Sequence, residues 1–182
     1  MKNDYLSPNF RIKEFTESAT AHKYGIDNTP PAEAVNNLKM LCVHTLEPLR
    51  MALQLPVVIT SGFRTKALND KVAHSSKRSQ HMQGQAADFY VAQTPVSGSM
   101  FQGSDAAGSK FKVQGRRELL IKAFREIITN PEIDYDQLIL YPTFIHVSYV
   151  SREQNRRTIL IGMRNGKLGY GKCSVKNALT IV

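Results

Sequence analysis

The segment SQHMQGQAAD, residues 79–88, carries a histidine and an aspartate separated by small and polar residues. Zinc takes imidazole nitrogens and carboxylate oxygens as ligands, and a catalytic zinc site uses three protein ligands and keeps a fourth position open. His81 and Asp88 would supply two of these ligands, so a third must come from elsewhere in the chain.

The natural candidate for the third ligand is His146, in the segment FIHVSY. Alternation along a strand puts His146 on the same face as Phe144 and Ser148. A polar imidazole in an otherwise apolar strand needs a partner, and either a metal or a hydrogen-bonding group of the core would serve. Taken alone, His146 is better explained as a core histidine.

The net charge of the chain indicates which classes of partner it could bind. The chain has 182 residues and a formal net charge of +9, from 24 Lys and Arg against 15 Asp and Glu. This charge favours a polyanionic partner, which could be nucleic acid, an acidic membrane surface or an anionic cell wall. The basic residues are scattered and no nucleic-acid motif accompanies them, so no nucleic-acid partner is expected. The alternative is a basic surface without a partner.

Cysteines and apolar runs give further limits. Cys42 and Cys173 give neither a disulfide framework nor a CxxC pair for a cysteine zinc site. No apolar run is long enough to span a membrane. The N-terminus, MKNDYLSPNF, lacks the apolar region of a secretory signal. We therefore expect a protein that is cytoplasmic as synthesised and that acts on a cell wall only after release.

Helices are expected to support the strands that carry the candidate ligands. A long helix is expected from Thr29, whose side chain can cap it, and the two following prolines fit the first turn. Pro48 lies inside the apolar pattern of this helix and predicts a kink or a break. Shorter helices are expected at 65–73 and 115–129. The segment 93–113 is rich in Gly and Ser and is expected to be irregular.

Strands must carry the candidate ligands. The β-branched run 56–60 and the segment 86–91 are typical of strands. Residues 136–140 and 144–150 predict an antiparallel hairpin, and 158–163 a further strand. This order of elements predicts an α+β fold, with a small antiparallel sheet that carries the metal site and packs against helices.

The length of the chain fits one domain with a full core. We expect a helical part at 1–55, a core with the metal site at 56–163 and a tail at 164–182. We also expect a monomer.

Four motifs now occur in one order along the chain. They are Ser61-Gly62-Phe63-Arg64, Ser79-x-His81-x-x-Gly84-x-Ala86-x-Asp88, Asp136-Gln137-Leu138-Ile139 and Ile145-His146-Val147-Ser148. In this order they resemble the zinc peptidase family of D-alanyl-D-alanine carboxypeptidases, dipeptidases and L-alanyl-D-glutamate endopeptidases of phage lysins. The likeness is greatest to the short single-domain branch of phage and bacterial cell-wall enzymes, and the motifs span residues 56–150.

The resemblance implies zinc held by His81, Asp88 and His146 in the fold of the zinc D-Ala-D-Ala carboxypeptidases, which is Hedgehog-like. It implies hydrolysis of a peptide bond in the peptidoglycan stem, of the D,D-carboxypeptidase or the L-Ala-D-Glu endopeptidase type, by metal-activated water. Arg64 would bind a substrate carboxylate or the oxyanion. Ser61 and Ser79 are expected to contact substrate or to hydrogen-bond within the site.

One position departs from the family pattern. The family usually has an acid three residues before the last histidine ligand, and here that residue is Thr143, which cannot take a proton at neutral pH. Asp136 could serve as the base, or it could only orient another group of the site. If the base is lost, the alternative function is a zinc-stabilised module that binds cell-wall peptides without cutting them.

Overall fold

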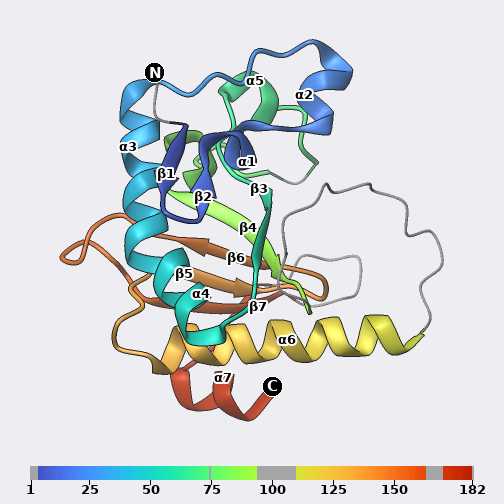
Figure 1. Cartoon of the computed structure of the whole chain (residues 1–182), viewed down its shortest axis with the longest axis vertical. Helices are drawn as coiled ribbons and strands as arrows, with labels where there is room; N and C mark the ends of the chain where they lie inside the picture. The colour runs from blue at the N-terminus through green and yellow to red at the C-terminus, as the bar shows by residue number, and fades with distance from the viewer. Residues whose placement is uncertain (1–3, 74, 94–109, 163–169, 182) are drawn as a thin grey trace.

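The computed structural model describes residues 4–73, 75–93, 110–162 and 170–181 (Figure 1). The strands are β1 (Tyr5–Ser7), β2 (Phe10–Arg11), β3 (Val57–Ser61), β4 (Ala86–Val91), β5 (Gln137–Leu140), β6 (Ile145–Ser148), β7 (Thr158–Gly162) and β8 (Tyr170–Lys172). The helices are α1 (Ile12–Thr16), α2 (Ala19–Tyr24), α3 (Ala32–Leu41), α4 (Glu47–Leu53), α5 (Lys66–Asn69), α6 (Lys110–Thr129) and α7 (Val175–Ile181), with a π-helical turn η1 (Cys42–Leu46) and a 3-10 turn η2 (Gln80–Gln83).

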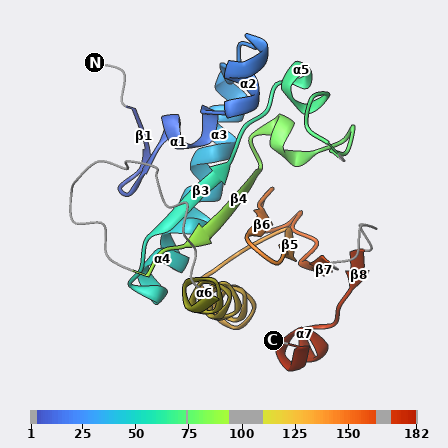
Figure 2. The ribbon, with the colours of Figure 1, turned by 90° about the vertical axis from the view of Figure 1, so that its right-hand side faces the viewer.

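The main sheet has six strands in the order β3-β4-β6-β5-β7-β8, and helices pack against it (Figure 2). The expected α+β class and the hairpin of β5 and β6 are confirmed. One pair, β5 and β7, is parallel, which the sequence did not predict. β6 pairs with one edge of β5. After β6 the chain crosses over, and β7 pairs with the other edge of β5 in the same direction as β5.

The two faces of the sheet differ in chemistry. On β4, Ala87, Phe89 and Val91 are buried in the apolar core, which Leu120 and Phe124 of α6 also line. Because side chains alternate along a strand, Asp88 lies on the opposite face. The candidate metal ligands therefore lie on the face of the sheet opposite the apolar core.

The long N-terminal helix departs from expectation at its start, and of the kink or break expected at Pro48 it shows no break. It begins at Ala32 with Pro31 as its N-cap residue, so Thr29 does not cap it; the Thr29 hydroxyl donates to Asp27. No break occurs at Pro48; the π-helical turn η1 precedes it, and the Glu47 amide donates to the Cys42 carbonyl. Proline has no N–H and cannot donate to the preceding turn of the helix. A wider, π-helical turn accommodates this missing hydrogen bond.

Several smaller elements differ from the sequence-based expectation. The β1–β2 hairpin was not predicted, α5 is shorter than residues 65–73, and the segment 164–182 contains β8 and α7. The irregular segment 93–113 lies mainly outside the described residues, and its last residues begin α6. None of the described helices is long and apolar enough to cross a membrane.

Candidate metal centre

Three neighbouring strands present polar side chains in one row. In the ladder, Asp88 of β4 pairs with Ser61 of β3 on one side and with His146 of β6 on the other. Directly paired residues of an antiparallel ladder point to the same face of the sheet. Strand pairing alone therefore places His146 beside Asp88.

His81 comes from η2, the short turn that precedes β4. Gly84 ends this turn with φ of 70°, a left-handed conformation that glycine adopts without steric cost. The His81 Nδ1 atom lies 2.7 Å from the carbonyl oxygen of Gly62. Because that carbonyl can only accept, Nδ1 carries the proton, and Nε2 is left with a lone pair for a metal.

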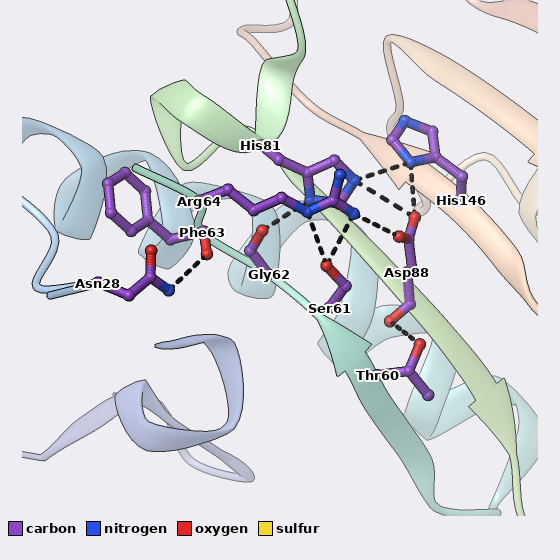
Figure 3. A network of polar contacts seen from close by, with 9 residues as sticks. All are labelled: Asn28, Thr60, Ser61, Gly62, Phe63, Arg64, His81, Asp88 and His146. Carbon is purple, nitrogen blue, oxygen red and sulfur yellow. Dashed lines mark hydrogen bonds and ion pairs between the residues drawn. The ribbon is translucent and has the colours of Figure 1, made fainter. Parts of the chain in front are cut away.

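The three candidate ligand atoms lie close together (Figure 3). His81 Nε2 is 3.2 Å from His146 Nδ1 and 3.3 Å from Asp88 Oδ1. His146 Nδ1 is 2.8 Å from Asp88 Oδ1. Tetrahedral zinc with bonds of ~2.0 Å holds its ligand atoms roughly 3.3 Å apart. The donor set and its spacing therefore fit a zinc ion with three protein ligands.

The charges of the site also suit a metal. Burial lowers the pKa of the His81 imidazole below its ordinary value, which keeps it neutral near pH 7. Burial opposes the charge on Asp88, but the charge that His81 carries when protonated and the hydrogen bond from His146 outweigh it and hold the pKa of its carboxyl below the usual range. Two imidazole nitrogens and one carboxylate as ligands would leave a bound divalent cation with net positive charge.

Arg64 joins the site through the second oxygen of Asp88. Its Nη2 donates to Asp88 Oδ2 at 3.0 Å, and Nε and Nη2 both donate to Ser61 Oγ. Asp88 thus faces the histidines with Oδ1 and the guanidinium with Oδ2 (Figure 3). The structure brings Ser61 and Arg64 together with the three candidate ligands.

The chain matches the family model described as Peptidase M15 over residues 8–118, which is more than half of its length. The chain belongs to the peptidase M15 family. This confirms the resemblance inferred from the motifs. The matched range includes Arg64, His81 and Asp88, whereas His146 lies beyond it. No curated protein matches the chain.

Among the described contacts of this M15 family member, none joins Ser79 or Thr143 to the ligand atoms. Ser79 is half-buried and is the N-cap residue of η2, where its carbonyl accepts from the Met82 amide. Thr143, which stands where the family usually has an acid, is exposed in the connection between β5 and β6.

Asp136 lies directly before β5 and is fully buried. Its Oδ1 accepts from the backbone amide and the Nε of Arg156, each at 2.8 Å. Its Oδ2 accepts from Arg156 Nη2, from Gln80 Nε2 at 2.9 Å and from Ser148 Oγ at 3.4 Å. A carboxylate offers about four lone-pair directions, so these donors occupy Asp136 completely.

Gln80 and Arg156 also neighbour the site, and the sequence did not predict this. Arg156 was visible only as part of a short basic cluster, and nothing in its spacing from Asp136 indicates contact. The stacked rings of Tyr141 and Phe144, whose centroids are 4.3 Å apart, were not predicted either. Alternation along the strand had already placed Phe144 on the His146 face, but nothing in the sequence indicated Tyr141 as its partner.

Metal loading gives a direct test of the three ligands. We expect zinc to raise the melting temperature of the chelator-treated protein, because a ligand of the folded state at a hundred times its Kd stabilises by about 2.7 kcal/mol. Differential scanning calorimetry at increasing zinc concentration measures this shift. An unchanged melting temperature at saturating zinc, with no metal retained after desalting, would rule out the site.

Proposed function

We propose that the chain is a zinc metallopeptidase that hydrolyses a peptide bond of the peptidoglycan stem. The observation that carries the proposal is the approach of His81 Nε2, Asp88 Oδ1 and His146 Nδ1 to within 3.3 Å of one another. Membership of a peptidase family supports the same chemistry. When bound by such ligands, zinc activates a water molecule for attack and polarises the scissile carbonyl.

The residues around the ligands have distinct tasks in this proposal. The Gly62 carbonyl fixes the tautomer of His81, and Arg64 fixes the orientation of Asp88. The Arg64 side chain is 13% exposed, so its edge reaches solvent. We assign its remaining N–H groups to a substrate carboxylate or to the oxyanion of the transition state, and Ser61 holds the guanidinium in place for that purpose.

Asp136 is better suited to orientation than to proton transfer. Burial opposes its charge, but the hydrogen bonds from Arg156 and Gln80 outweigh it and lower the pKa of its carboxyl. A base must release its hydrogen-bond donors to accept a proton from water, and a depressed pKa weakens it further. Of the two roles considered from the sequence, the contacts favour the orienting one.

The stem peptide is the proposed substrate class for two reasons. The sequence motifs resemble those of enzymes that cut a stem bond of the D,D-carboxypeptidase or the L-Ala-D-Glu endopeptidase type. The net charge of +9 also suits an anionic cell wall. Incubation of the zinc-loaded protein with a synthetic stem pentapeptide tests the activity, since each cut bond releases one new amino group.

The alternative function is a module that binds wall peptides without cutting them. Thr143 is exposed where the family usually has an acid, and the Asp136 carboxylate is fully engaged by other groups. This alternative predicts retention of the same pentapeptide on the immobilised zinc-loaded protein, with no new amino group after long incubation.

Replacement of Arg64 by lysine is expected to lower kcat/KM about 100-fold, the usual loss when one donor to an oxyanion is removed. Lysine keeps the charge but cannot contact Ser61 and Asp88 with one planar group. Steady-state kinetics on the pentapeptide measures the change. Arg78→Lys, at an exposed position before η2, is the control. Equal kcat/KM in both variants would refute the role of Arg64.

A further inference from the structure

A charged group is buried beside the metal-site segments without touching the ligand atoms described above. Asp136 is fully buried and forms an ion pair with Arg156, which reaches it from the connection between β6 and β7. The Arg156 side chain is 58% exposed, so only the carboxylate is withdrawn from water. Burial of that one charge still costs free energy, which its hydrogen bonds must repay. A buried carboxylate paired in this way is weak evidence for added stability, so its position calls for another explanation.

The pair is connected to η2 through Gln80. The Gln80 amide nitrogen donates to Asp136 Oδ2 at 2.9 Å, and the Gln80 amide oxygen accepts from Arg156 Nη2 at 3.4 Å. Gln80 therefore contacts both ions. Only one orientation of its side-chain amide places the nitrogen at Asp136 and the oxygen at Arg156. Because His81 is the next residue along η2, the ion pair fixes the backbone from which His81 projects.

The opposite side of η2 rests on α3. The amide nitrogen of Asn37 donates to the carbonyl of Gln83 at 2.8 Å, and Gly84 lies against the backbone of Ala34. These contacts hold the end of the turn, whereas Gln80 holds its start. Without Gln80, η2 would keep the contact of His81 with the Gly62 carbonyl after β3, but it would lose its link to Asp136 beside β5.

The same carboxylate also reaches the strand of His146. Ser148 donates to Asp136 Oδ2 and accepts from the Gln137 amide, and the Asp136 amide donates to the Ser148 carbonyl at 2.7 Å. Ser148 lies two residues after His146 on β6 and faces the same side of the sheet. Asp136 is thus linked to the two segments that carry the histidines.

We propose that Gln80, Asp136 and Arg156 form a brace that positions His81 relative to His146 for metal binding. The inference rests on the proposed metal site, and it makes these three residues positioning residues. Groups that orient ligands in this way typically contribute 10–100-fold to metal affinity or activity. The brace explains why a carboxylate is buried at this place with Arg156 as its partner, and why the third member is a glutamine.

The test compares two glutamines of the same short turn. Gln80→Ala removes the link to Asp136, and Gln83→Ala removes an exposed side chain of η2. We expect Gln80→Ala to weaken zinc binding about 10-fold in competition with a chromogenic chelator, and to shift the visible absorption of the cobalt-loaded protein. Gln83→Ala should leave both measurements as in the unaltered chain.

A second measurement needs no metal. In the metal-free protein, the amides of Met82, Gly84 and Gln85 donate within or around η2, and their hydrogen exchange should be faster in Gln80→Ala than in Gln83→Ala. If the unaltered protein binds no zinc, the proposed function fails, and this exchange still decides the brace. Equal exchange rates and equal zinc affinities in the two variants would overturn it.

Coupling between the residues gives a third measurement. If Gln80 and Asp136 act as one unit, the double variant Gln80→Ala/Asp136→Asn should bind zinc no more weakly than Asp136→Asn alone. Losses of affinity that multiply in the double variant would show that the two residues act independently, which would refute the brace.

Discussion

Replacement of His81 by alanine is expected to abolish zinc binding and peptidase activity together. His81 Nε2 is one of three ligand atoms, and the groups that only orient ligands already contribute 10–100-fold to affinity. Loss of a ligand itself should therefore exceed about 100-fold in zinc affinity. Metal content after dialysis and turnover of the stem pentapeptide measure the two effects on one preparation.

The control for this variant is His22→Ala, because His22 is an exposed histidine on α2. It should bind one zinc ion per chain and retain full turnover. A His81→Ala protein that holds zinc as tightly as His22→Ala would contradict the ligand assignment. If it bound zinc weakly but turned over substrate at the normal rate, the metal would have no part in the reaction.

Replacement of Gly84 by alanine is expected to destabilise the metal-free protein by about 3 kcal/mol. Two effects add at this position. The backbone has φ of 70°, which L side chains rarely adopt, and an added Cβ would collide with the carbonyl oxygen of Ala34 on α3. Because Gly84 ends the turn that carries His81, the displaced turn should also weaken zinc binding. Urea unfolding with and without zinc separates the two effects.

Gly25 offers a matched control for the steric part of this effect. It also has a left-handed backbone, with φ of 59°, but an added Cβ would meet nothing within 4 Å. Gly25→Ala should therefore cost only about 1 kcal/mol, from backbone strain alone, and should not alter zinc affinity. Equal destabilisation by the two substitutions would show that the contact with Ala34 is unimportant.

The residue types of the candidate site could be predicted from the sequence. His81 and Asp88 stand out because glycine and alanine separate them, and alternation in FIHVSY assigns a face to His146. These signals are local, and short-range periodicity reports them reliably. The α+β class follows from the same periodicities and from the order of the elements.

Strand register could not be predicted to the residue. Asp136 was expected roughly opposite Ser148, but Gln137 occupies that position in the ladder. Asp136 instead reaches Ser148 through its side chain and is fixed by Arg156. Apolar alternation tolerates such a shift at the end of a strand, where the first residue is not yet part of the ladder.

Contacts made by irregular segments could not be predicted from the sequence either. Arg156 approaches Asp136 from a connection in which Arg157 has a positive φ of 49°. No periodic pattern encodes the path of such a segment. The parallel pairing of β5 and β7 depends on the same connection, so one unpredicted loop accounts for both omissions.

The most direct test of zinc peptidase function is digestion of purified peptidoglycan, with the released fragments identified by mass spectrometry. The account predicts new peptide termini with the zinc-loaded protein and none with His81→Ala or with excess chelator. The fragment masses would also identify the stem bond. Unchanged peptidoglycan, with one zinc ion confirmed on each chain, would contradict the account and favour a module that binds wall peptides without cutting them.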